Sequence, residues 1–243
     1  MPGVHCIVPA RMGSTRFPGK PLVKLCGKEM ILRTLERAKK ANCFDKVVCA
    51  TDSEKILQVV ENAGFSVVMT GEAATGSDRV LEAAQKLNSD FIVNLQGDEP
   101  LAEIHLLQEI TKELLKFPEA WVTAASKLSC KDFHNNTIVK VLYLNNKAID
   151  FTRDISENSF LNNKTWGAHR GIYAYSMESL SEFGKTKRTF REISESLEQL
   201  RIIDKREIRI VETPFASASV DVLSDVPVLE RMISEEELLK EKI

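Results

Sequence analysis

Apolar runs and segments of helical period alternate through the first 118 residues of the chain. Four runs rich in Val, Ile and Phe have the length and composition of buried strands, at 4–8, 47–51, 65–70 and 91–95. Apolar positions three or four residues apart follow them and predict helices over 29–41, over 53–63 with Ser53 as N-cap, over 77–88, and through Leu107, Ile110 and Leu114 to near Pro118. This alternation predicts an α/β fold, with a mostly parallel sheet and helices on both faces.

The second half of the chain is less regular, and its pattern predicts more strands than helices. Strands are expected at 121–126, 138–142, 171–175 and 207–212, with helices at 190–203 and from about 227 to 240. The polar stretch 154–168 has no helical period and predicts a loop. No segment rich in Gly or Pro divides the chain, so residues 1–243 are expected to form one domain.

The polar residues of greatest interest fall in loops that follow predicted strands. In an α/β sheet, ligands bind beyond the carboxyl ends of the parallel strands. The loops at that edge are 9–21, 51–53, 70–79 and 96–100. We therefore expect the functional site to be built from these loops.

The first of these loops is basic and contains two glycines. Arg11, Arg16 and Lys20 place three cations within ten residues, while Gly13 and Gly19 allow close approach of the backbone. Backbone N–H groups and charge-assisted hydrogen bonds of this kind suit a polyphosphate. The spacing matches neither a Walker A loop nor G-x-G-x-x-G. On composition alone, a basic surface loop explains the segment equally well.

Two acidic positions far apart in the chain are candidate metal ligands. Asp98 follows the run at 91–95, and a carboxylate at the end of such a strand can hold Mg²⁺ against phosphate oxygens. Taken alone, the block 96–100 is better explained as a turn, because Gly-Asp and Glu-Pro are turn dipeptides. The second position is Asp221, with Asp225 as an alternative. Two carboxylates meeting over one polyphosphate would suit metal-assisted nucleotidyl transfer.

Composition narrows the class of protein. Apolar residues make up 43% of the 243 residues and charged residues 28%, which is typical of a folded globular chain. A formal net charge of −2 gives no electrostatic case for a nucleic-acid or membrane partner. No apolar run approaches the ~20 residues of a membrane-spanning helix, and the first residues lack a signal-peptide pattern. Five cysteines without a C-x-x-C pair indicate reduced thiols. We expect a cytoplasmic protein.

The polar blocks together resemble the 3-deoxy-manno-octulosonate cytidylyltransferases, also called CMP-Kdo synthetases. In the first half the resemblance runs through 7–22, Thr51-Asp52, Thr75-Gly76-Ser77-Asp78-Arg79 and 94–100. In the second half it continues with Lys140-Val141, Phe151-Thr152-Arg153, His169-Arg170-Gly171-Ile172-Tyr173 and Leu197-Glu198-Gln199-Leu200-Arg201. These blocks follow the family's order along nearly the whole chain.

The resemblance implies a nucleotidyltransferase fold and a Mg²⁺-dependent reaction. CTP and the sugar acid 3-deoxy-manno-octulosonate (Kdo) would give CMP-Kdo and pyrophosphate, for lipopolysaccharide synthesis. It also implies a CTP-binding half over about 1–125, a sugar-binding and dimerisation region over about 126–205, and a closing strand and helix over 206–243. The implied partners are CTP, the sugar acid and, in a homodimer, a second copy of the chain.

The resemblance also carries residue roles over by position. Arg11 and Lys20 would hold the triphosphate, with Ser14 and Arg16 nearby, and Arg11, Lys20 and Asp98 form the expected catalytic set. Arg79 and Gln96 would line the nucleotide and sugar pocket, and Asp98 and Asp221 would hold Mg²⁺. Five residues would contact the sugar acid: Arg153, His169, Tyr173, Glu198 and Gln199. Such a site suits phosphoryl chemistry, where positioning and electrostatic stabilisation dominate.

Four departures from the family's pattern lie in the second half of the chain, which would bind the sugar acid and supply the second metal ligand. Asp150 replaces an aromatic residue, Val222-Leu223 replaces Thr-Pro, 191–196 lack a His, and 154–168 lack an Ile-Pro stretch. The CTP half shows no such departure. An amino analogue such as 8-amino-Kdo is therefore an alternative substrate, because the Asp150 carboxylate would favour a nearby ammonium. A surface aspartate on a strand is the simpler interpretation.

Two further hypotheses concern the class of activity. One is a cytidylyltransferase for another 2-keto-3-deoxy sugar acid. The other is a paralogue that binds CTP or a CMP-sugar without turnover; the joint presence of Arg11, Lys20, Asp98 and Asp221 argues against it, because binding alone needs no two metal carboxylates. A dinucleotide-dependent oxidoreductase is disfavoured, since no G-x-G-x-x-G follows the first strand.

Overall fold

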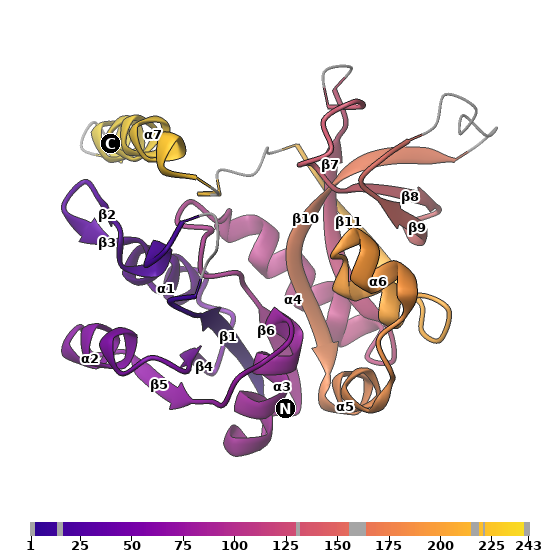
Figure 1. Ribbon diagram of the computed structural model, residues 1–243, viewed down its shortest axis with the longest axis horizontal. Helices are drawn as coiled ribbons and strands as arrows, with labels where there is room; N and C mark the ends of the chain where they lie inside the picture. Colours follow the sequence, from indigo (N-terminus) through magenta and orange to yellow (C-terminus); the bar gives the residue numbers. More distant parts are fainter. Residues whose placement is uncertain are drawn as a thin grey trace.

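One nine-stranded sheet runs through the molecule, in the order β5-β4-β1-β6-β10-β7-β11-β9-β8 (Figure 1). The computed structural model describes residues 3–13, 17–129, 132–155, 164–214, 219–220 and 222–240. Four strands of the first half pair in parallel, as predicted: β1 (Val4–Ala10), β4 (Lys46–Thr51), β5 (Ser66–Met69) and β6 (Phe91–Asn94). Their carboxyl ends lie at one edge of the sheet, where the polar loops begin.

The four helices predicted in the first half are confirmed. They are α1 (Met30–Lys40), α2 (Glu54–Asn62), α3 (Gly76–Leu87) and α4 (Ile104–Lys116). Ser53 does occupy the N-cap of α2, but its side chain makes no capping hydrogen bond. Thr75 caps α3 instead with a side-chain oxygen that accepts from the backbone N–H of Asp78.

The strands of the second half make the sheet mixed, which corrects the prediction of a mostly parallel one. They are β7 (Trp121–Lys127), β8 (Lys140–Leu144), β9 (Lys147–Thr152), β10 (Thr165–Ser176) and β11 (Ile208–Thr213). β10 runs antiparallel to β6, β7 and β8, while β11 is parallel to β7 and antiparallel to β9. Because β8 pairs with both β9 and β10, the five strands close into a ring.

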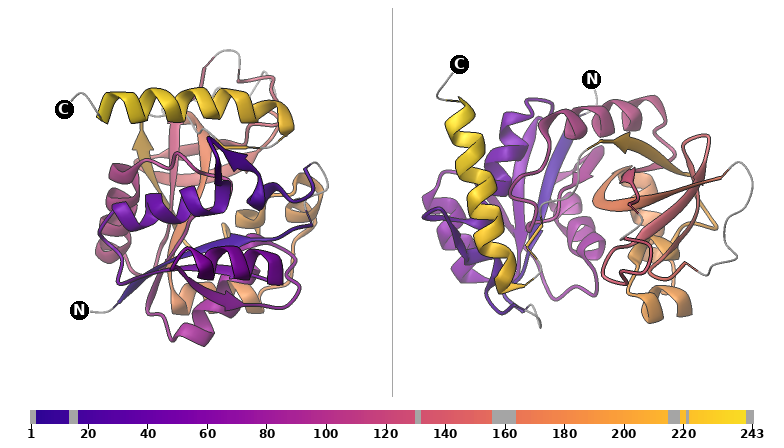
Figure 2. Two further views of the ribbon diagram at one scale, coloured as in Figure 1. Left: turned by 90° about the vertical axis from the view of Figure 1, so that its left-hand side faces the viewer. Right: turned by 90° about the horizontal axis from the view of Figure 1, so that it is seen from above.

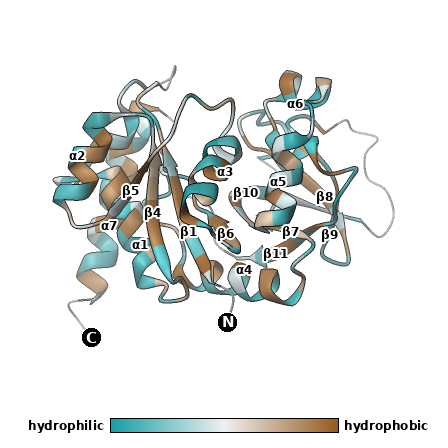
Figure 3. Cartoon of the chain, turned by 90° about the horizontal axis from the view of Figure 1, so that it is seen from below, coloured by the Kyte–Doolittle hydropathy of each residue, from teal (hydrophilic) through white to brown (hydrophobic). Residues whose placement is uncertain are grey.

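Helices cover both faces of the first-half sheet, and each face has its own apolar core. One core joins alternate residues of β1 to α1, α2 and α4, through side chains such as Leu35, Val60 and Leu107. The other joins Ile7 on the opposite face of β1 to α3 and α5 (Met177–Lys185). In Figure 3 the strands are mostly brown, whereas brown and teal alternate around the helices, as this two-sided burial requires.

The helix predicted over 190–203 is wrong in its second part. α6 (Phe190–Glu195) begins with a capping box between Thr189 and Glu192 and ends where Ser196 adopts a left-handed backbone with φ of 55°. A separate 3-10 turn, η2 (Glu198–Arg201), follows. The apolar period continues across this break, which is why periodicity alone suggested one helix.

The loop predicted over 154–168 is also partly wrong, because β10 begins at Thr165; residues 156–163 lie outside the described residues. β9 was not predicted. The hairpin between β8 and β9 turns at Asn145 and Asn146, both with positive φ, of 50° and 60°. Two such residues in sequence are typical of a hairpin turn, so Asn145-Asn146 was the local signal for β9.

The predicted closing helix is present as α7 (Val226–Lys240) and packs back on the first half (Figure 2). Leu229 and Ile233 join an apolar cluster with Leu25 and Met30, and Arg33 forms an ion pair with Glu237 at 3.2 Å. Shorter elements complete this region: η1 (Lys20–Leu22), β2 (Lys24–Leu25), β3 (Lys28–Glu29) and η3 (Leu223–Asp225). Among the described residues, no helix has the length and apolar character needed to cross a membrane.

Candidate functional site

Two adjoining cavities open at the carboxyl ends of the parallel strands, where the sequence placed the site. The smaller has a volume of about 260 Å³ and is lined by the loops after β1, β5 and β6. The larger, of about 590 Å³, is lined mainly by second-half residues. Gln96 and Asp98 line both cavities, so the two binding spaces meet at the loop that follows β6.

The smaller cavity contains the basic residues predicted to hold a triphosphate. Arg11 and Lys20 both line it, together with Pro9, Gly76 and Gly97. Gly97 is required here because a Cβ atom at this position would lie 2.8 Å from the carbonyl oxygen of Pro9. The loops after β1 and β6 can therefore approach each other closely enough to form a narrow, positively charged cleft.

Lys20 joins three distant parts of the chain at the boundary between the cavities. Its Nζ lies 2.6 Å from Oδ2 of Asp98 and donates to the carbonyl oxygen of Val220 at 2.8 Å. The backbone N–H of Val220 in turn donates to the carbonyl oxygen of Asp98 at 3.2 Å. The segment before α7 is thus held against the loop that carries Asp98.

Arg79 lines the smaller cavity from α3, and its guanidinium also connects neighbouring strand ends. It donates to Oγ1 of Thr70 and to Oδ2 of Asp52, each at 2.5 Å, and its side chain is almost fully buried. Asp52 follows β4 and Thr70 follows β5. Arg79 therefore connects Asp52 to the block 75–79, whose residues Thr75, Gly76 and Arg79 line this cavity.

Three residues assigned by resemblance, Ser14, Arg16 and Asp221, lie outside the described residues. The alternative carboxylate, Asp225, accepts a hydrogen bond from the backbone N–H of Val222 at 2.9 Å, as a turn cap does. Within the described ranges, no three His, Cys, Asp or Glu side chains gather as a metal-binding group. Asp98 is the described carboxylate that borders both cavities beside the basic loop.

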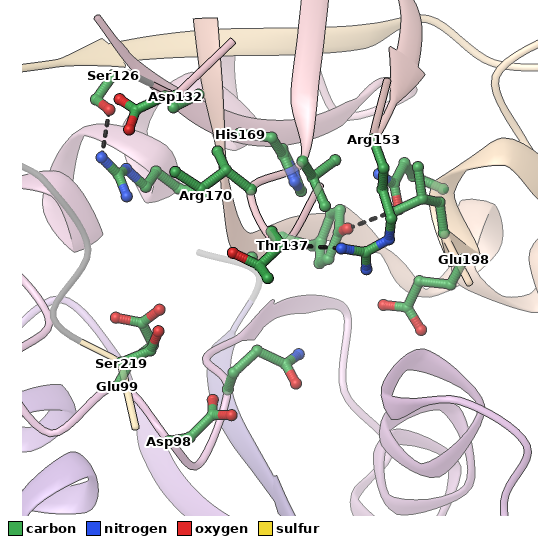
Figure 4. Close-up of a pocket in the computed structure, with 18 of the residues that line it drawn as sticks. Asp98, Glu99, Ser126, Asp132, Thr137, Arg153, His169, Arg170, Glu198 and Ser219 are labelled. Carbon is green, nitrogen blue, oxygen red and sulfur yellow. Dashed lines mark hydrogen bonds between the residues drawn. The ribbon is translucent and has the colours of Figure 1, made fainter. Parts of the chain in front are cut away.

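All five residues assigned to the sugar acid line the larger cavity, which the structure assembles from three parts of the second half (Figure 4). His169 and Tyr173 come from β10, Arg153 follows β9, and Glu198 and Gln199 belong to η2. The five residues are far apart in the sequence. Closure of the strand ring brings β9 and β10 together, and η2 then packs against β9.

His169 is neutral in this environment. Burial, together with the nearby charges of Arg170 and Arg153, lowers the pKa of His169 to about 3. Its Nε2 lies 2.9 Å from Oγ1 of Thr123, whose hydroxyl also lies 2.7 Å from the carbonyl oxygen of Ile172. Because the hydroxyl proton is directed to a carbonyl, Nε2 carries the ring proton and donates to Thr123. Nδ1 is then a hydrogen-bond acceptor.

Gln199 is buried and Glu198 is half-buried, and both have specific partners. Both carboxylate oxygens of Glu198 accept from Ser77, one from its backbone N–H at 3.1 Å and one from its hydroxyl at 2.9 Å. Burial nevertheless raises the pKa of Glu198. Oε1 of Gln199 accepts from the Tyr173 hydroxyl at 3.0 Å. Its Nε2 has no hydrogen-bond partner within the described part of the chain, and so is a donor suited to a substrate oxygen.

The 3-10 turn η2 is anchored to the N-terminal turn of α3. Arg201 forms ion pairs with Asp78 at 2.8 Å and with Glu192 at 2.5 Å, and all but Asp78 are nearly inaccessible to solvent. Ser77 and Asp78 thereby bind Glu198 and Arg201 from the opposite half of the molecule. The two polar blocks Leu197–Arg201 and 75–79, which are separate in the sequence, therefore contact each other in the fold.

Arg170 is the principal lining residue that sequence reasoning missed. It lines the larger cavity opposite Arg153 and donates to Oγ of Ser126 (Figure 4). His169 and Arg170 are adjacent, so strict strand alternation would place them on opposite faces. Both residues nevertheless line the larger cavity. β10 pairs with β7 in regular register at His169 and Arg170, and the register shifts only beyond them, before Tyr173. Other lining residues without a prior assignment are Glu99, Lys127, Asp132, Thr137 and Ser219.

The suggested role of Asp150 in recognising an amino group is not supported. Asp150 lies on β9, where it forms an ion pair with Arg191 at 3.0 Å and accepts a hydrogen bond from the backbone N–H of Phe151. It lines neither cavity. The simpler interpretation, an aspartate on the outer surface of a strand, agrees with the structure.

Comparison with known proteins identifies a family and a fold. Residues 5–210 match the family model described as Cytidylyltransferase. A 3-deoxy-manno-octulosonate cytidylyltransferase of Pelobacter propionicus is 38% identical over 92% of this chain and 94% of its own length, and that of Geobacter sulfurreducens is 37% identical over 94% and 99%. A solved structure of a CMP:2-keto-3-deoxy-manno-octonic acid synthetase complexed with CTP superposes with a TM-score of 0.89 and 30% identity, covering 96% of this chain and 99% of that one.

Proposed function

Because this chain belongs to the cytidylyltransferase family, and matches 3-deoxy-manno-octulosonate cytidylyltransferases along nearly its whole length, we propose that it makes CMP-Kdo. It transfers CMP from CTP to the anomeric hydroxyl of Kdo and releases pyrophosphate. The observation that carries this proposal is the pair of cavities meeting at Gln96 and Asp98, one containing basic side chains and one lined mainly by polar side chains. A nucleotide and a sugar acid can thereby meet at one carboxylate.

The reaction needs positioning and charge stabilisation rather than a covalent protein intermediate. The sugar hydroxyl loses its proton and forms a bond to the α-phosphorus, while the bond from that phosphorus to the bridging oxygen breaks and pyrophosphate leaves. Negative charge spreads over the phosphoryl oxygens during transfer. Arg11 and Lys20 lie in the cavity proposed for the triphosphate, where their charges stabilise it.

The larger cavity offers the donors and acceptors that a sugar acid requires. We assign Arg153 to the carboxylate, because its guanidinium contacts neutral carbonyl oxygens of Glu195, Asn136 and Thr137 and keeps its charge available for an anion. Nε2 of Gln199 and Nδ1 of His169 suit hydroxyl groups, one as donor and one as acceptor. Both carboxylate oxygens of Glu198 accept hydrogen bonds from Ser77, so we assign Glu198 to holding the start of α3 and not to a direct contact with the substrate.

Magnesium is the cofactor that we propose, with Asp98 and Asp221 as its protein ligands. Carboxylate oxygens are the ligands Mg²⁺ prefers, and Asp98 borders both cavities. The hydrogen bonds between Val220 and both Lys20 and Asp98 support this assignment, since Val220 immediately precedes Asp221. When bound, the ion would stabilise charge on the phosphates and lower the pKa of the attacking hydroxyl.

The direct test is pyrophosphate release from CTP and Mg²⁺ with a panel of sugar acids: Kdo, 8-amino-Kdo and a sialic acid. We expect turnover with Kdo and a preference for it over 8-amino-Kdo, because Asp150 is outside the cavities. Omitting the sugar acid is the control for CTP hydrolysis. Absence of release with every sugar acid, despite calorimetric binding of CTP, would favour a binding-only protein and contradict the proposal.

We also propose that the protein forms a homodimer through its second half. Exposed apolar side chains gather there on α6 and the neighbouring β8–β9 hairpin: Phe190, Ile193, Leu144 and Ile149. The two elements are joined by the ion pair of Arg191 with Asp150. Phe190 is 85% exposed, an unusual environment for a phenylalanine unless another chain covers it.

Replacing Phe190 with aspartate is expected to convert the dimer into monomers at micromolar concentration. The change adds a charge at the centre of the proposed contact but removes no internal packing, so the monomer should keep its melting temperature. Sedimentation velocity measures the outcome. Leu239→Asp, on α7, is the matched control because Leu239 is also strongly exposed but lies on another surface. If the second variant dissociates instead of the first, the dimer contact lies on α7.

A further inference from the structure

A completely buried lysine lies behind the larger cavity and has no role in the activity described so far. Lys140 is the first residue of β8, and its side chain has no solvent exposure. It does not line either cavity. Its backbone pairs with Thr152 on β9 and with Ala168 on β10, so it sits where these strands meet beside the sugar-acid cavity.

The ammonium group of Lys140 connects two separate segments through their backbones. Nζ donates to the carbonyl oxygen of Asn135 at 2.8 Å and to that of Arg153 at 2.7 Å. Both acceptors are neutral. Burying an ammonium is costly unless hydrogen bonds compensate, and here the compensation depends on both carbonyls being present together. The charge therefore holds the two segments at a fixed separation.

The side chain of Arg153 also joins its own segment to the backbone around residue 136. Its guanidinium donates to the carbonyl oxygens of Asn136 and Thr137, at 3.3 and 3.2 Å, and to that of Glu195 at 2.8 Å. Two buried or half-buried cations thus join the backbone at 135–137, at 153 and at 195. Each of these segments, or the residues next to it, lines the larger cavity.

Within the described ranges of the chain, Lys140 has no direct carboxylate partner. Burial lowers the pKa of Lys140, and Arg153 lowers it further, whereas Asp154 and Asp132 raise it. Its hydrogen bonds to the described residues go to backbone oxygens alone. Such contacts fix the position of the main chain and are independent of the side chains at 135 and 153.

We propose that Lys140 is a positioning residue for the sugar acid: it joins residue 135 to residue 153 and so sets where the Arg153 guanidinium lies in the cavity. This inference rests on the proposed function, because it takes the larger cavity as the sugar-acid site. Lys140 contacts no substrate. Its effect is on recognition of the sugar acid, while the CTP cavity, built from first-half loops, does not depend on it.

The test is Lys140→Met, which keeps the length and volume of the side chain but removes the charge and the donors. We expect KM for Kdo to rise about tenfold or more, as displacement of a positioning group does, with KM for CTP within twofold of wild type. Hydrogen exchange should quicken at 132–139 but not in α3. Tyr143→Phe is the matched control: it removes another buried hydrogen bond of β8, to Glu212 at 2.9 Å, away from the cavity.

Several outcomes would overturn the proposal. They are an unchanged KM for Kdo, equal rises for both substrates, and unchanged exchange at 132–139. Lys140→Gln, which retains a donor without charge, serves if the methionine variant does not fold, with the same directions expected. If neither variant folds, Lys140 is a folding determinant and the proposal is wrong. If the wild-type protein does not use Kdo, the proposed function fails, but hydrogen exchange still decides whether Lys140 holds 132–139.

Discussion

Replacing Asp98 with asparagine is expected to lower kcat at least about 100-fold, the range observed when one preorganised electrostatic contact is removed from a reacting group. Asp98 borders both cavities and is the described carboxylate at the point where they meet. Asparagine keeps the size of the side chain but removes the charge that would attract Mg²⁺. The protein should remain folded, because the partly exposed Lys20–Asp98 pair contributes only about 1 kcal/mol or less.

Steady-state pyrophosphate release over a range of Mg²⁺ concentrations measures this effect. We expect the variant to need more Mg²⁺ for any residual activity. Asp225→Asn is the matched control, since Asp225 accepts a backbone hydrogen bond at a turn and should change kcat little. Wild-type kcat for Asp98→Asn would exclude Asp98 as a metal ligand, and a large loss in the control would move the second metal ligand to Asp225.

Replacing Lys20 with methionine should raise KM for CTP by about tenfold to 100-fold, with a smaller change in KM for the sugar acid. The ammonium lies in the smaller cavity and would contribute a charge-assisted hydrogen bond to the triphosphate, worth up to about 3 kcal/mol. Methionine preserves the apolar stem, so the loss reports the charge. The variant should also have a lower kcat, because Lys20 holds Val220 against Asp98.

Calorimetric titration with CTP separates these two contributions, because it measures binding without turnover. Lys24→Met is the matched control: it removes a lysine from the same region, but one whose side chain is largely exposed and only loosely paired with Glu29, at 3.9 Å. The control should bind CTP as the wild type does. Unchanged CTP affinity in Lys20→Met would show that Lys20 acts on the 219–220 segment alone and not on the triphosphate.

The first half of the fold was predictable because its signals are local. Each strand of β1, β4, β5 and β6 is an apolar run, and each following helix has a clear apolar face. Parallel connection by helices places all the strand ends on one edge. The loops at 9–21 and 96–100 therefore had to meet there, and the structure brings Lys20 and Asp98 to within 2.6 Å.

The second half was less predictable because its arrangement depends on contacts between distant residues. Ser196 breaks the helix predicted over 190–203 by adopting positive φ, and this residue type rarely signals such a change. Strand alternation did not predict that Arg170 lines the same cavity as its neighbour His169. Family resemblance assigned Glu198 and Gln199 to the sugar acid, but it did not indicate their contacts with Ser77 and Tyr173.

The sequence by itself determined the parallel half of the sheet, the edge at which the two cavities open, and the cations and carboxylate that meet there, because each follows from the period and order of residues along the chain. Only the tertiary structure decided that the sheet is mixed, that Asp150 faces away from the cavities, that Arg170 faces into one, and that Lys140 is buried behind it. The physical reason is the pairing of β10 with β6, β7 and β8, which are distant from it in the sequence. Such pairing sets the direction and burial of side chains, and no local pattern of residues encodes it.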